Sequence, residues 1–286
     1  MKWLVTGAGG QLGADLLRQI PAADALGLTH QDLDITDAAA VLAALERMRP
    51  DVIVNAAVYS AVDQAESDEA AAYAVNATGP RNLATAAAAV GARLIHVSTD
   101  YVFAGDAVTP YPADAPTAPK TVYGRTKQAG EQFVREILPD ASWVVRTAWL
   151  YGATGKNFVK TMVRLEGSRE TVSVVDDQRG SPTWSADLAA GLISLAGSET
   201  APGILHCTNS GDTTWWGLAR AVFEELGADP DRVRPTTSAE YPFPTPRPAY
   251  SVLSDSEWLA AGLPRLRDWR TALRDAFAEV GDALRG

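Results

Sequence analysis

Apolar residues form short continuous runs in the first half of the chain, and the segments between these runs have helical periodicity. Five runs predict strands, at residues 2–6, 25–29, 52–55, 94–98 and 143–146. Four intervening segments predict helices, at residues 11–20, 38–48, 70–90 and 123–138. Continuous apolar runs are typical of parallel strands that are covered on both faces. Because strands and helices alternate strictly, the pattern predicts an α/β fold with a doubly wound parallel sheet.

The pattern changes after about residue 150. Strands are expected at residues 171–176 and 204–207, and helices at residues 185–196, 215–226 and 266–284. Residues 241–248 contain four prolines, which fit neither a helix interior nor a central strand, so we expect an ordered loop there. Two domains are predicted. The first comprises residues 1–150 with a returning segment near 184–208, and the second, smaller and mixed α/β, comprises residues 151–183 and 209–286.

Charge and composition exclude several classes of protein. The formal net charge of −10 argues against unspecific binding to nucleic acid and against docking on anionic lipid, which both need a basic surface. No apolar run reaches the roughly 18–20 residues of a membrane span. A strand that starts at residue 2 leaves no room for a signal peptide, so we expect a cytoplasmic protein. Cys207 is the only cysteine, which excludes a disulfide framework and a metal site built on several thiolates.

A glycine-rich turn, Gly7-Ala8-Gly9-Gly10-Gln11-Leu12-Gly13, joins the first predicted strand to the first helix. Gly7 would allow the tight turn, Gly10 the close approach of a pyrophosphate, and Gly13 the packing of the helix against the sheet. The phosphates would then bind the free N–H groups at the helix N-terminus. Between a strand and a helix of an alternating α/β chain, this turn predicts a Rossmann-type NAD(P)-binding domain.

The sequence leaves the choice between NADH and NADPH open. An acidic residue at the end of the second strand would favour NAD, but residues 29–31 are Thr-His-Gln, with neither a carboxylate nor an arginine for a 2′-phosphate. Asp34 and Ile35 follow shortly afterwards and could cover the adenine. Asp34 could equally cap the next helix.

Tyr123 and Lys127 form a Tyr-x-x-x-Lys pair on a predicted helix, so both side chains lie on one face. Delivery of hydride to a carbonyl leaves an alkoxide that needs a proton. A cation beside the tyrosine would lower the pKa of its phenol from about 10 and suit it to this task. Thr99, at the carboxyl end of the fourth strand, could bind the same carbonyl oxygen. Asp100 next to it could contact the substrate or cap the following turn.

These motifs resemble a known family. The glycine turn, Asn55-Ala56-Ala57, the segment 98–103 (Ser-Thr-Asp-Tyr-Val-Phe) and the Tyr-Lys pair are similar to the extended short-chain dehydrogenase/reductases. Four further segments, at residues 61–66, 146–151, 157–162 and 177–183, narrow the resemblance to the dTDP-4-dehydrorhamnose reductase family. The resemblance runs from residue 1 to about residue 275.

The resemblance implies an enzyme that reduces the 4-keto group of dTDP-4-dehydro-L-rhamnose with NADPH or NADH, giving dTDP-L-rhamnose for cell-wall polysaccharide or a secondary metabolite. Tyr123 would be the acid, Lys127 its electrostatic partner and ribose ligand, and Thr99 the carbonyl anchor. The other implied positions are Gly10, Gln11 and Leu12 at the pyrophosphate, Asp34 and Ile35 at the adenine, Ala56, Ala57 and Tyr59 at the middle of the coenzyme, and Trp149 in the sugar pocket. Ala148 and Tyr59 replace the Ser and Thr of many relatives.

Further expectations concern the substrate half. A nucleotide diphosphate needs cations and hydrogen-bond donors, and the candidates in the second half are Lys156, Asn157, Lys160, Arg179 and Arg247. Trp215 and Trp216 are expected to pack in the core. Some members of the family use a metal ion at a contact between two subunits, so a homodimer and Mg²⁺ are candidates, although no carboxylates for the metal stand out.

Two alternatives remain open. The chain could be a reductase or epimerase for another nucleotide-linked keto-deoxysugar; a dehydratase would want a glutamate after the acidic residue, where this chain has Tyr101. It could also be a non-catalytic regulatory subunit of the same fold, which would not need Thr99, Tyr123 and Lys127 together.

Overall fold

The computed structural model describes residues 1–241 and 244–285 of the chain. Its main sheet has six parallel strands in the order β10-β5-β4-β3-β1-β2. These strands are β1 (Trp3–Thr6), β2 (Ala25–Leu28), β3 (Val52–Asn55), β4 (Arg93–Thr99), β5 (Ser142–Thr147) and β10 (Gly203–His206). The predicted α/β fold with a parallel sheet is confirmed.

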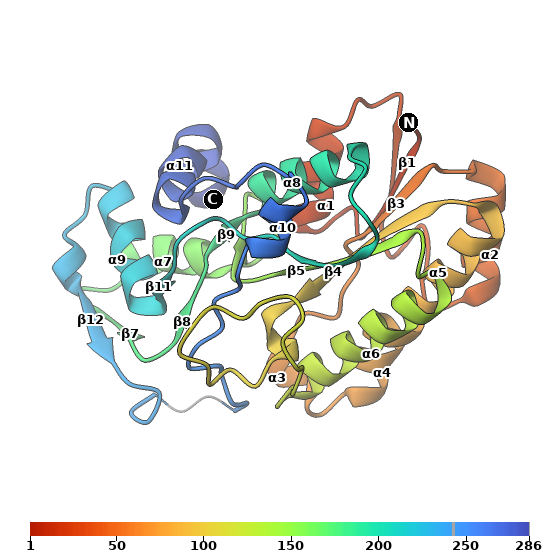
Figure 1. Ribbon diagram of the computed structural model, residues 1–286. Helices are drawn as coiled ribbons and strands as arrows, with labels where there is room; N and C mark the ends of the chain where they lie inside the picture. The colour runs from red at the N-terminus through yellow and green to blue at the C-terminus, as the bar shows by residue number, and fades with distance from the viewer. Residues whose placement is uncertain (242–243, 286) are drawn as a thin grey trace.

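Helices cover both faces of this sheet (Figure 1). One face carries α1 (Gln11–Gln19) and α8 (Ser185–Gly197), whose apolar residues join those of the strands in one core. The other face carries α2 (Ala38–Met48), α5 (Gly79–Val90) and α6 (Val122–Ile137), which enclose a second core. Shorter helices between β3 and α6 are α3 (Val62–Ala65), α4 (Glu69–Tyr73), the π-helix η1 (Ala74–Thr78) and the 3₁₀-helix η2 (Asp100–Val102).

A third core lies in the smaller part of the molecule, at the left of Figure 1. There β7 (Val172–Val175) pairs in parallel with β12 (Val233–Thr236), beside α7 (Phe158–Glu166), α9 (Trp215–Glu225) and α11 (Trp269–Arg285). The remaining elements are β6 (Leu150–Tyr151) paired with β9 (Thr183–Trp184), β8 (Arg179–Gly180) paired with β11 (Thr213–Thr214), η3 (Pro230–Arg232) and α10 (Ser256–Ala260).

Some elements differ from the sequence-based expectations. The helix expected at 70–90 contains the π-helical turn Ala74–Thr78, and the last helix begins at Trp269 rather than near residue 266. Helix Phe158–Glu166 and strand Val233–Thr236 were not expected. Of the loop expected at 241–248, residues 242 and 243 lie outside the described residues. Among the described helices, none has the length and apolar character needed to cross a membrane.

The topology of the sheet creates a crevice at one edge. From β1 the chain continues to β2 on one side and later returns to β3 on the other, so the loops after β1 and β3 leave the sheet in opposite directions. Ligands of open α/β sheets bind at such a switch point, beyond the carboxyl ends of the strands. The glycine turn after β1 and residues Ala56 and Ala57 after β3 meet there.

Candidate active site

The three glycines of the first turn are each required for a different geometrical reason. Gly7 has a φ of +69°, and a Cβ there would lie 2.6 Å from the backbone of Ala56. A Cβ on Gly13 would overlap the carbonyl oxygen of Gly7, so only glycine lets α1 pack this closely. At Gly10 the nearest atom to an added Cβ is that same oxygen, at 3.3 Å, which leaves the outer side of the turn open.

The N-terminus of helix α1 has the features of an anion-binding site. Its N-cap residue is Gly10, which has no side chain to satisfy the first N–H groups, and its first turn holds no acidic residue. The backbone N–H groups of Gln11 and Leu12 are therefore available to a phosphate. Leu12 buries its side chain in the core. Gln11 accepts a 2.9 Å hydrogen bond on Oε1 from Asn157 Nδ2.

Asn157 thus lies at the glycine turn and not in the apolar cavity described below. Its Oδ1 caps α7 by accepting from the Lys160 N–H at 2.9 Å, and its Nδ2 also donates to the Gly152 carbonyl at 2.8 Å. These bonds give Asn157 a positioning role that joins α7 to the start of α1. A direct contact with substrate stays a prediction.

The loop after β3 is fixed by a residue that sequence analysis missed. Asn76, in the π-helix η1, accepts from the Tyr59 N–H at 2.9 Å and donates to the Tyr59 carbonyl and to Thr126 Oγ1, both at 3.1 Å. Thr126 belongs to α6, so Asn76 ties the loop after β3 to the helix that carries Tyr123. Interruptions of this helical type are frequent at functional sites, but nothing in the local sequence around Asn76 distinguishes it from an ordinary helical residue.

Asp34 and Ile35, the two residues expected at the adenine, differ in burial: Asp34 is exposed and Ile35 is buried. Asp34 holds Thr36 by accepting from its N–H at 2.9 Å and its hydroxyl at 2.8 Å, whereas the N-cap of α2 is Asp37. The alternative role of Asp34 as the helix cap is therefore wrong. Ile35 is buried in the core against Gly79, and Asn82 donates to its carbonyl at 3.0 Å.

Tyr123 lies in the first turn of α6, whose start is held from two sides. Thr121 caps the helix by accepting from the Gly124 N–H at 3.0 Å, and Glu66 Oε1 accepts from the Val122 N–H at 2.8 Å. The Tyr123 ring meets the Tyr101 ring edge to face, with centroids 5.5 Å apart. Thr99 lies close enough to Tyr123 to influence the pKa of its phenol, so the expected Thr–Tyr pair is brought together.

The pKa of Tyr123 is shifted upwards, whereas the sequence predicted a downward shift. Burial raises the pKa of Tyr123 above its ordinary value, Asp100 raises it further, and the nearby Thr99 side chain only partly opposes these effects. The ammonium of Lys127 is bonded elsewhere, to the Val97 carbonyl at 2.7 Å. The expectation that Lys127 lowers the pKa of the phenol is thus wrong for this structure, because desolvation of a phenolate dominates. The phenol therefore keeps its proton at neutral pH.

The pKa of Lys127 is also shifted from its ordinary value. Its side chain is only 2% exposed, and this burial lowers its pKa to about 8, while Glu131 one turn further along α6 acts in the opposite direction. Asp100 is also buried, which raises its pKa to about 6, although hydrogen bonds with Ser251 and Thr99 oppose the rise. Thr99 donates to Asp100 Oδ1 at 3.0 Å.

A buried ion pair supports this end of the sheet. Arg146 on β5 makes two hydrogen bonds to the carboxylate of Glu131, at 2.9 and 2.7 Å, and both side chains are nearly inaccessible. Ser98 Oγ donates to Glu131 Oε1 at 2.5 Å. Arg146 also donates to the Ala113 carbonyl at 3.1 Å and lies over the Phe103 ring. The network fixes α6 on β4 and β5, directly behind Lys127.

An apolar cavity of about 400 Å³ is lined mainly by residues of α7 and β7. Trp215 lines it, with Phe158 tilted against the Trp215 ring at 4.5 Å. Trp149 has a φ of +48° and stacks on the Trp215 ring, with centroids 3.5 Å apart. Trp215 is therefore part of a cavity wall as well as of the packing expected for it. Further lining residues are Tyr101, Thr161, Met162, Leu165, Val174, Gln178, Tyr241 and Arg247.

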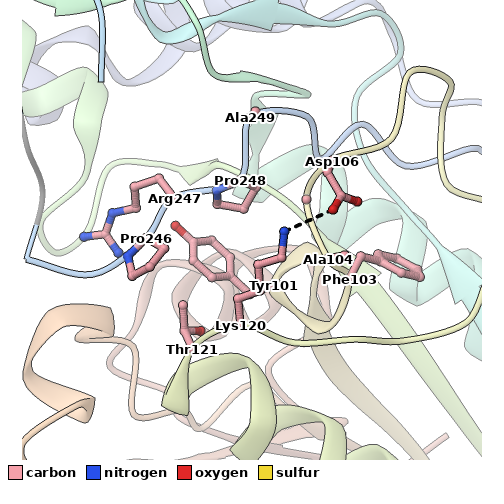
Figure 2. Close-up of a pocket in the computed structure, with 11 residues that line it drawn as sticks. Tyr101, Phe103, Ala104, Asp106, Lys120, Thr121, Pro246, Arg247, Pro248 and Ala249 are labelled. Carbon is pink, nitrogen blue, oxygen red and sulfur yellow. Dashed lines mark hydrogen bonds and ion pairs between the residues drawn. The ribbon is translucent and has the colours of Figure 1, made fainter. Parts of the chain in front are cut away.

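The candidate cations are distributed unevenly around this cavity. Arg247 lines it and makes a 2.7 Å ion pair with Asp63 of α3 and a hydrogen bond with Tyr101. Lys160 donates to the Ala153 carbonyl at 3.0 Å, Arg179 pairs with Asp212, and Lys156 is exposed. Tyr101 and Arg247 also line a second cavity of about 200 Å³, and Figure 2 shows Pro246, Arg247 and Pro248 beside the Tyr101 ring.

Residues 1–241 and 244–285 hold no group of three or more His, Cys, Asp or Glu side chains that could bind a metal ion. The magnesium ion that the resemblance suggested has no structural support in this part of the chain.

The parallel sheet, the glycine turn and the neighbouring Thr99 and Tyr123, with Lys127 one helical turn after Tyr123, define an extended short-chain dehydrogenase/reductase. More narrowly, the chain belongs to the family described as the RmlD substrate binding domain, whose model matches residues 1–281. It is 57% identical to a dTDP-4-dehydrorhamnose reductase of Streptomyces griseus, over 96% of this chain and 93% of the relative. It is 53% identical to a probable dTDP-4,6-dihydroxy-2-methyloxan-3-one 4-ketoreductase of Streptomyces antibioticus, over 98% and 96%. A crystal structure of dTDP-4-dehydrorhamnose reductase from Bacillus anthracis in complex with NADP has a TM-score of 0.94 at 38% identity, covering 98% of this chain and all of that one.

Proposed function

We propose that this protein is a dTDP-4-dehydrorhamnose reductase, which reduces the 4-keto group of dTDP-4-dehydro-L-rhamnose to give dTDP-L-rhamnose with a nicotinamide coenzyme. The observation that carries the proposal is the closeness of Thr99 and Tyr123 at the carboxyl edge of the parallel sheet, where the glycine turn also lies. Beside this pair, the Tyr101 ring, which contacts Tyr123, also lines the apolar cavity. Relatives more than 50% identical carry names of dTDP-sugar reductases.

The glycine turn fits the coenzyme. The open side of Gly10 and the free N–H groups of Gln11 and Leu12 would hold the pyrophosphate, and Gly7 and Gly13 keep the turn and helix in place. Asp34 and Ile35 would flank the adenine, and Ala56, Ala57 and Tyr59 would lie along the middle of the molecule. The bound coenzyme would supply the hydride that reduces the sugar carbon.

The proton comes from the protein. Tyr123 holds a neutral phenol, which donates its proton to the carbonyl oxygen as negative charge develops there. When the substrate is bound, the Thr99 hydroxyl would turn from Asp100 to donate a hydrogen bond to the same oxygen and polarise the carbonyl before transfer. Lys127 would bind ribose hydroxyls of the coenzyme. The higher pKa of a substrate alkoxide makes the transfer from phenol favourable even though burial raises the pKa of Tyr123.

The apolar cavity suits the nucleotide end of the substrate. The aromatic faces of Trp215 and Phe158 can stack on flat or apolar surfaces, and Trp149, which follows β5 in the chain, stacks on Trp215. Arg247 provides the cation that a diphosphate needs, and Asp100 adjoins the reacting sugar. In this arrangement residues 1–150 with 184–208 bind the coenzyme, and residues 151–183 with 209–286 bind the substrate.

A second candidate is reduction of a different dTDP-linked 4-keto-deoxysugar. The observation that favours it is the high identity to the Streptomyces antibioticus relative, which carries the name of such an enzyme. The two candidates share the coenzyme turn and the proton donor and differ only in how the cavity orients the sugar ring.

Steady-state assays separate these candidates. The purified chain is incubated with reduced coenzyme and either dTDP-4-dehydro-L-rhamnose or dTDP-4-keto-6-deoxy-D-glucose, and the product is identified by NMR. We expect the higher kcat/KM with the first substrate and an L-rhamno product. A higher value with the second substrate would favour the alternative, and no oxidation with either would refute a reductase.

A further inference from the structure

The segment that follows β2 lies directly beside the glycine turn. The Ala8 N–H donates to the Leu28 carbonyl at 3.1 Å, and a Cβ on Gly9 would lie 3.7 Å from the Thr29 side chain. In a sheet of this type, the adenosine ribose of a bound dinucleotide lies against the end of the second strand. The chemistry of residues 29–34 therefore bears on which coenzyme fits.

Asp32 places a carboxylate at this strand end, although it is three residues further along the chain than the end itself. Its Oδ2 accepts from the Thr29 N–H at 2.9 Å and from the Thr29 hydroxyl at 2.6 Å, so the side chain is folded back onto Thr29. These two hydrogen bonds lower the pKa of the Asp32 carboxyl, which is exposed and charged at neutral pH. Oδ1 is left as an acceptor beside the turn.

Positive charge is scarce around this carboxylate. The sequence has no lysine or arginine between Arg18 and Arg47, and the single histidine in that interval is His30. Arg18 is paired with Asp15, and Arg81 of the neighbouring helix α5 lies over the Phe133 ring at 5.6 Å. Asp34, also exposed, adds a second negative charge two residues from Asp32.

We propose that Asp32 is a specificity-determining residue that makes this protein prefer NADH to NADPH. A carboxylate accepts a hydrogen bond from a ribose 2′-hydroxyl, whereas a 2′-phosphate at the same position meets a fixed negative charge with no arginine or lysine from residues 19–46 to offset it. The inference rests on the proposed function, because it requires the dinucleotide to bind at the glycine turn. It also separates this chain from the Bacillus anthracis relative, whose structure contains NADP.

The test is direct binding of each coenzyme to the full-length protein, followed by the fluorescence of the reduced nicotinamide without any substrate. We expect NADH to bind about tenfold more tightly than NADPH at low salt. The difference should shrink as salt is added, since Asp32 is exposed and its charge is screened.

Asp32→Asn removes the charge and keeps an acceptor oxygen, so the variant should bind NADPH more tightly and bring the two dissociation constants close together. Asp24→Asn is the matched control, because it removes the same charge just before β2, at the opposite end of the strand; it should leave the ratio unchanged. Equal or tighter binding of NADPH by the unmodified protein, or an unchanged ratio in Asp32→Asn, would overturn the inference while leaving the reductase intact. Binding of neither coenzyme would instead refute the proposed function.

Discussion

The glycine turn proposed for the coenzyme and the apolar cavity proposed for the substrate are built from different kinds of atoms. On the coenzyme side, the contacts available to a ligand are backbone N–H groups and the space left by missing side chains, all within residues 7–13. On the substrate side, the walls are side chains such as Phe158, Trp215 and Arg247, which come from segments far apart in the sequence. A backbone site leaves few ways to change without losing the turn, whereas a wall of side chains can be altered one residue at a time. Relatives that share the first side can therefore differ in the sugar that they reduce.

Tyr123 stands between the two sides, and its removal should have the largest effect. In Tyr123→Phe the ring remains against Tyr101 but the proton donor is lost, so kcat should fall by about 10²- to 10⁴-fold. The dissociation constant of the coenzyme should stay within about twofold, because the glycine turn is untouched. Single-turnover kinetics measure the first quantity and fluorescence titration the second. A variant with near-normal turnover would remove the phenol from the mechanism.

Gly10 and Gly13 test whether the coenzyme side is a backbone site. A valine at position 10 points to open space where the pyrophosphate would lie, so coenzyme affinity should fall by about a hundredfold with little change in Tm. A valine at position 13 would instead overlap Gly7 and should destabilise the fold by about 1–3 kcal/mol. Thermal unfolding and coenzyme titration on both variants separate the two effects. Tight coenzyme binding by Gly10→Val would place the phosphates elsewhere.

Trp215→Ala tests whether the apolar cavity binds the substrate independently of the coenzyme turn. The indole stacks on Trp149 and forms part of the cavity wall, so its loss should raise KM for the dTDP-sugar by about tenfold, as expected for one lost aromatic contact. Coenzyme affinity should not change. The informative control is Trp216→Phe, since Trp216 donates to the Val233 carbonyl at 3.0 Å and does not line the cavity. If Trp215→Ala weakens both ligands equally, the two sides are not independent.

The smallest expected effect is the pH dependence of coenzyme binding. Burial lowers the pKa of Lys127 to about 8, so its ammonium is charged below that pH and becomes a neutral amine above it. Affinity should be constant at lower pH, about twofold weaker at pH 8, and weaker still above it. Lys127→Met should bind weakly at every pH and lose this dependence. An unchanged pH profile in that variant would assign the titration to another group.

The features that sequence analysis identified are those whose geometry is local. Glycine spacing fixes the turn at residues 7–13, and a spacing of four places Tyr123 and Lys127 on one helical face. The features that it missed depend on contacts between distant segments. Asn76 matters because α6 packs beside it, and Asp32 because hydrogen bonds fold it back onto Thr29. The low pKa assigned to Tyr123 was wrong for the same reason, since spacing does not report burial or the Val97 carbonyl that holds Lys127.

The buried pair of Glu131 and Arg146 has a consequence for how this family can evolve. Losing either partner alone leaves an uncompensated charge in the interior, at a cost of about 3–5 kcal/mol, which is a large part of the stability of an ordinary domain. Glu131 and Arg146 are therefore expected to be conserved or replaced together. Descendants of this chain are expected to retain both residues or to exchange both together, and a lineage with only one of them should carry a second change within reach of the orphaned group.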